Sequence, residues 1–250
     1  MPSALPDEGI KKGIEFVMVS NKFIQRLLKA CQVVVLTGSA LKAKSVSGNL
    51  FSAEKLSFKE QRDRSAKTFW HTVQEARAQY RELKPNLGHY ALVDLENRFE
   101  DFALITTAID GLHKKAGNNH IIELRGNVFQ NRCGQCNTVF ESNGSSDIPV
   151  CPQCGSEDIL PNVLGEGDLP QAEKLKEAQR LAAEAEVFIT AGFNDMNRDI
   201  QALPFIARAN GAYLLELTAG ESAFTTAMDE TIIGNPAKYL TAIVLLLEKI

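Results

Sequence analysis

Four of the five cysteines in this 250-residue chain fall into two pairs with the spacing of metal ligands. Fourteen residues separate the two pairs, which are Cys133-x-x-Cys136 and Cys151-x-x-Cys154. A tight turn lets both thiolates of such a pair reach one tetrahedral ion. Zinc is the expected ion, and its role is structural because four cysteine ligands leave no coordination position open. Two disulfides or four unrelated thiols are the alternatives, and the cytoplasmic location that we expect for this chain disfavours the disulfides.

Six short apolar runs have the length and composition of buried strands. They are 33–37, 103–106, 121–124, 187–190, 213–217 and 231–233. Helical patterns lie before, between and after them, at 24–31, 69–82, 89–98, 172–185 and 242–247. Strands that alternate with helices predict an α/β fold with a doubly wound, Rossmann-like parallel sheet. Cys31 lies just before the first run, and we expect it in the core.

The cysteine pairs interrupt this alternation, which predicts a small domain inserted into the sheet domain. We expect a large domain over 1–41, 68–126 and 160–250. The small domain then takes 42–67, a loop with a short helix, and 127–159, the zinc ribbon.

Charge and hydropathy exclude two classes of partner. With 27 basic and 31 acidic residues the formal net charge is −4, which offers no basic field for nucleic acid or anionic lipid. The N-terminal residues lack a basic segment followed by an apolar core, and no apolar run reaches about 18 residues. We therefore expect a cytoplasmic protein without a membrane span.

Several strings, in collinear order, resemble the sirtuins, the family of NAD-dependent protein deacylases. They are the turn after 34–38, the helix over 84–96, the string 109–113 with Ala116-Gly117, the two cysteine pairs and the segment 160–170. The resemblance implies a Rossmann-like large domain, a small zinc-plus-helical domain, and a cleft between them for dinucleotide and acyl-lysine peptide. It also implies cofactor contacts at Gly38, Ser39, Ala40, Ser45 and Asp110.

The chemical centre of that family pattern is replaced. Where the resemblance implies a catalytic histidine, this chain has Arg125, which cannot deprotonate and so cannot act as a general base. The family's Gln and Asn, implied to hold ribose and water, are Thr107 and Ala108. Ala40 replaces a glycine of the phosphate turn, where its methyl group obstructs close backbone approach. Phe193 replaces a small polar residue, and we expect its ring in the core.

These losses predict a catalytically inactive, sirtuin-fold binding or regulatory module in which NAD binding is doubtful. Its ligand would be a protein partner or an altered small molecule in the interdomain cleft. The charged residues there, which either hold that ligand or pair with one another, are Arg125, Glu166, Asp168, Asp195 and Arg198. An anion held by Arg125 is a further possibility. The alternative is an NAD-dependent deacylase or ADP-ribosyltransferase with a non-standard active site.

Overall fold

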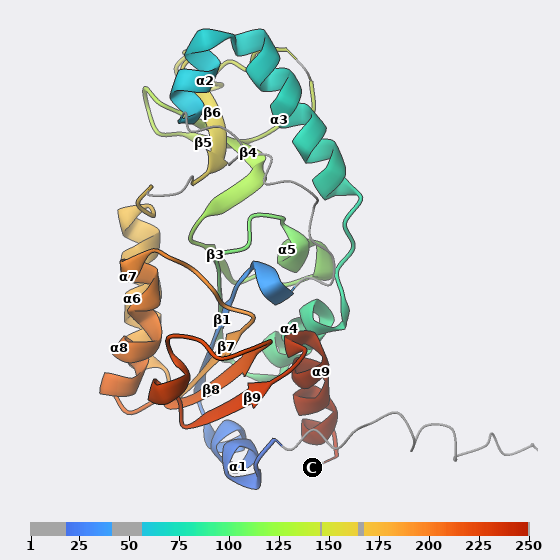
Figure 1. The fold of residues 1–250 in the computed structure, drawn as a ribbon, viewed down its shortest axis with the longest axis vertical. Coiled ribbons are helices and arrows are strands. Elements are labelled where there is room, and N and C mark those ends of the chain that lie inside the picture. Colours follow the sequence, from blue (N-terminus) through green and yellow to red (C-terminus); the bar gives the residue numbers. More distant parts are fainter. Residues whose placement is uncertain (1–18, 42–56, 146, 165–167, 250) are drawn as a thin grey trace, which may run out of the picture.

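The protein is described by a computed structural model over residues 19–41, 57–145, 147–164 and 168–249. Its larger sheet has six parallel strands in the order β3-β2-β1-β7-β8-β9 (Figure 1). Their bounds are β1 Gln32–Thr37, β2 Asp101–Thr106, β3 Ile121–Glu123, β7 Val187–Ala191, β8 Tyr213–Thr218 and β9 Glu230–Ile233. Each predicted strand is one of these six, so the expected doubly wound parallel sheet is confirmed.

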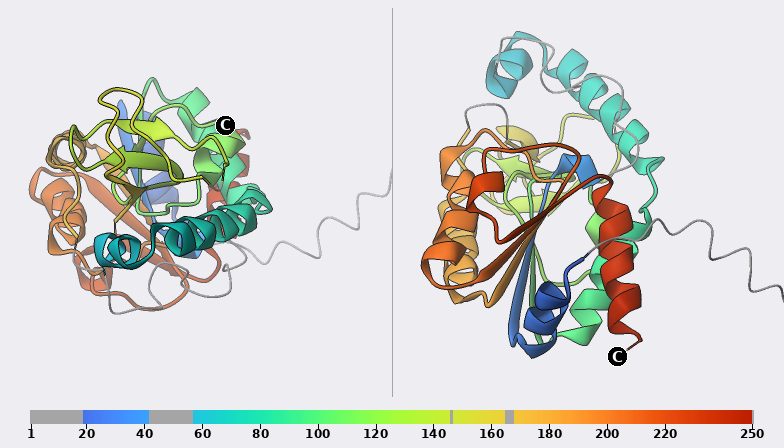
Figure 2. Two further views of the ribbon diagram at one scale, coloured as in Figure 1. Left: turned by 90° about the horizontal axis from the view of Figure 1, so that it is seen from above. Right: turned by 60° about the horizontal axis from the view of Figure 1, so that its bottom comes forward.

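Helices cover both faces of this sheet (Figure 2). One face carries α1 (Asn21–Lys29), α4 (Leu87–Arg98) and α9 (Pro236–Leu247), and the other carries α6 (Ala172–Glu184), α7 (Arg198–Gln201) and α8 (Leu203–Ala209). Alternate residues of a strand point to opposite faces. Val33 and Val35 accordingly pack in the first core cluster, and Val34 and Leu36 pack in the second. Burial on both faces explains why the strands read as unbroken apolar runs. No helix among the described residues is long and apolar enough to cross a membrane.

A second, antiparallel sheet lies at one end of the molecule (Figure 1). Its order is β5-β4-β6, with β4 at Gly126–Cys133, β5 at Val139–Glu141 and β6 at Ile159–Val163. Two helices, α2 (Phe58–Arg64) and α3 (Ala66–Arg81), pack with it. A third core cluster joins Phe69, Trp70 and Val73 of α3 to Cys133 and Cys151 of the ribbon. The domain boundaries stay a prediction. They place most of α3 in the large domain, whereas these three residues of α3 pack with the ribbon.

Sequence patterns placed the long helices well and predicted one short helix, but they missed other short ones. The short helix expected within 42–67 is α2, and the rest of that stretch before residue 57 lies outside the described residues. Among the described residues, three α-helices were not predicted: α5 (Leu112–Ala116), α7 and α8, which span too few turns to show a periodic pattern. The prediction for Cys31 is wrong, because this thiol is exposed. It follows the end of α1 in the turn that leads to the amino end of β1, outside the core.

Candidate functional sites

The four paired cysteines converge on one point of the ribbon. Their sulfur atoms all lie within 4.8 Å of one another. The Cys133 and Cys154 sulfurs are 3.7 Å apart, and those of Cys136 and Cys151 are 3.6 Å apart. A tetrahedral ion with bonds of about 2.3 Å to sulfur needs separations of about 3.8 Å, whereas a disulfide needs about 2.05 Å. The arrangement therefore fits one tetrahedral metal ion and no disulfide.

Matching turns aim the two pairs at that point. In the first, Cys133 donates its N–H to Thr138 and accepts from the N–H of Asn137; in the second, Cys151 bonds in the same way to Ser156 and Gly155. The residue after each pair is left-handed, with φ of +60° at Asn137 and +73° at Gly155. Glycine and asparagine are the residues that adopt this conformation most easily. Local sequence thus builds both halves of the cysteine cluster.

Arg77 on α3, which sequence reasoning did not single out, holds the ribbon together. Its guanidinium is fully buried and donates to the carbonyls of Val128 and Gln130, at 2.7 and 3.0 Å. It also donates to the side chains of Asn131 and Ser142, at 2.7 and 2.8 Å. Burial lowers the pKa of Arg77 to about 10. The pairing of β4 with β6 is irregular between Gly126 and Asn131, and Arg77 supplies the donors that this stretch needs.

We expect Arg77→Met to destabilise the protein by about 3 kcal/mol or more, because buried carbonyls lose their donors. Thermal unfolding followed by circular dichroism measures this loss. Arg81→Met is the matched control, since Arg81 lies one turn along the same helix and is exposed. Equal stability of the two variants would show that the buried bonds contribute nothing.

The sequence-predicted cleft residues lie beyond the carboxyl ends of the parallel strands, where open α/β sheets bind ligands. Gly38, Ser39 and Ala40 follow β1, and the last two begin a 3₁₀ turn at Ser39–Leu41. Ala108 and Asp110 follow β2. Arg125 follows β3, and both Phe193 and Asp195 follow β7. The fold therefore gathers them at one edge. Ser45, Glu166 and Gly167 lie outside the described residues, and the described Asp168 and Arg198 are exposed.

The turn after β1 is fixed by close contact with the turn after β7. A Cβ atom on Gly38 would lie 2.5 Å from the carbonyl oxygen of Gly192. Gly192 itself has φ of +60°, and a Cβ there would lie 2.7 Å from the backbone nitrogen of Leu41. Both positions therefore require glycine, whatever ligand the edge binds.

Arg125 is paired with an acid of the same chain. Its Nε and Nη2 atoms donate to the two carboxylate oxygens of Asp195, at 2.6 and 2.8 Å. The exposed fraction is 22% for the Arg125 side chain and 3% for that of Asp195. Asp195 is also held by its own loop, because it accepts the N–H of Asn197 and its carbonyl accepts from Gln201. The structure thus favours internal pairing for these two of the five cleft charges.

Beneath this edge lies a buried polar network that contains two histidines. Nε2 of His113 lies 2.9 Å from the Thr37 hydroxyl, which donates to Thr106. The rings of His113 and His89 are 4.8 Å apart between centroids. Burial, reinforced by His89, lowers the pKa of His113 to about 3, so its imidazole is neutral at physiological pH. Such a group has no spare basicity for proton abstraction near pH 7.

Other residues of the predicted cleft have structural contacts. The Asp110 carboxylate is buried and accepts the N–H of Leu112 at the start of α5. The backbone N–H of Ala108 donates to the Thr106 hydroxyl. Phe193 is buried in the second core cluster, and its ring centroid lies 5.3 Å from that of Phe224. The expectation that Phe193 packs as a core residue agrees with this burial.

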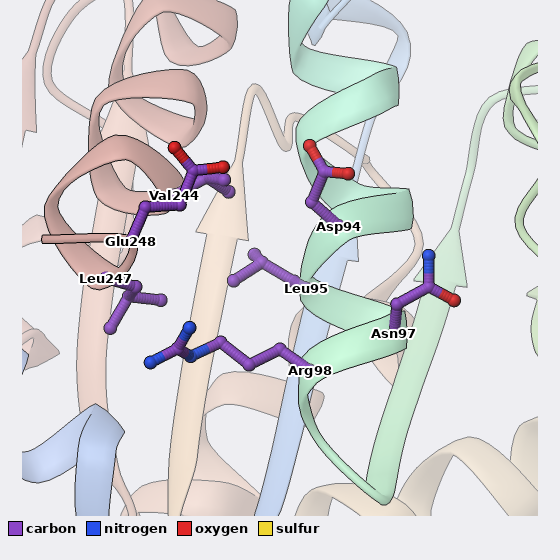
Figure 3. Close-up of a pocket in the computed structure, with 7 residues that line it drawn as sticks. All are labelled: Asp94, Leu95, Asn97, Arg98, Val244, Leu247 and Glu248. Atoms are coloured by element: carbon purple, nitrogen blue, oxygen red, sulfur yellow. The ribbon is translucent and has the colours of Figure 1, made fainter. Parts of the chain in front are cut away.

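A separate hollow of about 350 Å³ lies between the C-terminal halves of α4 and α9 (Figure 3). Its floor is apolar, with Leu95, Val244 and Leu247, and Asp94, Arg98 and Glu248 stand at its rim. Arg98 ends α4, just before the amino end of β2. This hollow is thus at the opposite edge of the sheet from Arg125.

Comparison with known proteins decides the family. A sequence model described as "Sir2 family" matches residues 37–195. This chain belongs to the Sir2 family. An NAD-dependent protein deacylase of Aquifex aeolicus is 34% identical over 209 residues, covering 79% of this chain and 87% of that protein. One of Pyrococcus abyssi is 31% identical over 204 residues, covering 78% and 81%. Its sirtuin resemblance is therefore confirmed.

Solved sirtuins share the fold. A Sir2–p53 peptide–NAD⁺ complex matches with TM-score 0.75 and 26% identity, covering 92% of this chain and 99% of that one. An ADP-ribose complex of a Sir2 homologue variant matches with TM-score 0.80 and 25% identity, covering 92% and 97%. Because these sirtuins are dinucleotide or ADP-ribose complexes, the comparisons give no support to the expectation that NAD binding is doubtful.

Proposed function

We propose that this sirtuin does not deacylate lysine and acts as a binding or regulatory module, with a protein or small-molecule ligand in its cleft. One observation carries the proposal: the position implied to hold the catalytic base has a guanidinium, bound at two points to Asp195. A guanidinium cannot accept a proton, and loss of a general base commonly lowers the rate by 10² to 10⁴. Ala108, which has no polar side-chain atom, adds a second loss at the implied ribose site.

We further propose that the ion held by the four cysteines is zinc. Four thiolate ligands at tetrahedral spacing favour zinc in a structural role. Such an ion would organise the ribbon and leave the chemistry of the cleft to the other residues.

The test is an NAD-dependent assay on an acetyl-lysine peptide with the full, zinc-loaded chain. We expect no deacetylation above the enzyme-free rate, with the Aquifex aeolicus relative as the positive control. Arg125→His should stay inactive as well, since Thr107 and Ala108 still lack the implied amide groups. NAD-dependent deacetylation by the unaltered chain would overturn the proposal.

A second candidate is an NAD-consuming enzyme with a different catalytic group. It is favoured by the relatives, which are NAD-dependent deacylases, and by the sirtuin complexes with NAD⁺ and ADP-ribose. Calorimetric titration with NAD, together with an assay for released nicotinamide, separates the two. Binding without nicotinamide release would support a dinucleotide-binding module, and release would support the enzyme.

A further inference from the structure

We propose that the Arg125–Asp195 pair is a latch that couples the ribbon-bearing end of the molecule to the turn after β1. Arg125 lies in one of the chain segments that join the two sheets, between β3 and β4. Its carbonyl accepts the N–H of Leu164, in the segment that returns from β6. One residue therefore holds both crossing segments.

The backbone on either side of Arg125 leaves little freedom. Leu124 is 1% exposed, packs in the second core cluster, and donates its N–H to the carbonyl of Thr106. On the other side, Gly126 has φ of +78°, and a Cβ there would lie 2.0 Å from the carbonyl oxygen of Asn162. The segment between β3 and β4 is therefore tightly packed, and the Arg125 side chain extends from it to Asp195.

Asp195 carries the connection to the turn after β1. Its loop begins at Gly192, where a Cβ atom would lie 2.7 Å from the backbone nitrogen of Leu41, and Gly38 donates its N–H to the carbonyl of Ala191. Asp195 is positioned by Asn197 and Gln201 without help from Arg125. The buried Asp195 carboxylate is thus held in a fixed position where the Arg125 guanidinium can bind it. Removing the Arg125 guanidinium would leave the Asp195 carboxylate, which is 3% exposed, without this partner, and that is strongly unfavourable for a buried charge.

The experiment is hydrogen exchange by mass spectrometry on the full, zinc-loaded chain. Arg125→Gln and Asp195→Asn should each speed exchange at least about tenfold in peptides that contain Leu164 and in those that contain Gly38 and Leu41. Those amides lie on both sides of the pair, whereas a purely local ion pair would change only the loop around residues 193–197. Asp195→Asn keeps a side-chain oxygen that can accept the N–H of Asn197. It is therefore the milder substitution, and it keeps the test available if Arg125→Gln does not fold.

Two further variants sharpen the result. The double variant Arg125→Gln/Asp195→Asn should exchange no faster than the faster single variant, because the contact is already lost. Arg62→Gln is the matched control: Arg62 is 12% exposed in its side chain and pairs with Asp158 inside the ribbon end. It should change exchange in the ribbon only. Three outcomes would each overturn the latch. The first is a double variant whose increase in exchange rate is the product of the increases in the two single variants. The others are faster exchange confined to residues 193–197, and the same pattern of faster exchange in Arg62→Gln. Hydrogen exchange does not depend on deacylation, so this test can fail or succeed independently of the proposed function.

Discussion

Removal of the metal ion should unfold the ribbon. Structural zinc contributes about 10–16 kcal/mol of apparent binding free energy in zinc-finger peptides, so its loss leaves this small sheet without its main support. We expect one zinc per chain by elemental analysis, and a fall of more than about 10 °C in Tm on chelation or in Cys133→Ser. The chain has one tryptophan, Trp70, which packs in the same cluster as Cys133 and Cys151. Its fluorescence should therefore report the unfolding directly.

Cys31→Ser is the matched control for this experiment. Cys31 is exposed and precedes β1, so its loss should leave both the zinc content and the Tm unchanged. A Cys133→Ser variant with unaltered zinc content and Tm would refute the metal centre.

Mild acid should destabilise the protein through His113. In the unfolded chain His113 gains a proton near its ordinary pKa of 6.5, but in the folded protein burial and His89 lower that pKa to about 3. Between these values the unfolded state binds the extra proton, so the free energy of unfolding falls as pH falls. The stability present above pH 6.5 is thus lost progressively toward pH 3, by up to roughly 1.4 kcal/mol per pH unit. Burial also lowers the pKa of His89, against the opposing charge of Asp110, which adds to the effect.

Urea unfolding at pH 7.5 and pH 5.0 measures this effect, and we expect a loss of roughly 2 kcal/mol. The window lies above the ordinary pKa of carboxylates. His113→Gln should reduce the dependence on pH, whereas His71→Gln should not, because His71 is 68% exposed in its side chain. If His113→Gln and the unaltered chain lose the same stability, the histidine is not the cause.

Much of the cleft follows from sequence once the strands are known. Residues that directly follow parallel strands must meet at one edge of the sheet, so the placement of Gly38, Ala108 and Arg125 could be predicted. The contacts that these residues make could not be predicted from the sequence. The sequence gives no sign that Gly38 packs against Gly192, because the two lie in separate turns.

The amino-acid sequence by itself determined the parallel sheet, the family and the cysteine cluster that could hold a metal ion. Strand and helix periods are local, and each Cys-x-x-Cys turn builds its own half of the ligand set. Only the tertiary structure decided the partners of Arg125 and Arg77 and the burial of His113. Arg125 and Asp195 are 70 positions apart, and Arg77 bonds to carbonyls 51 and 53 positions away. Such partners depend on where distant strands end and bulge, and no local pattern encodes that.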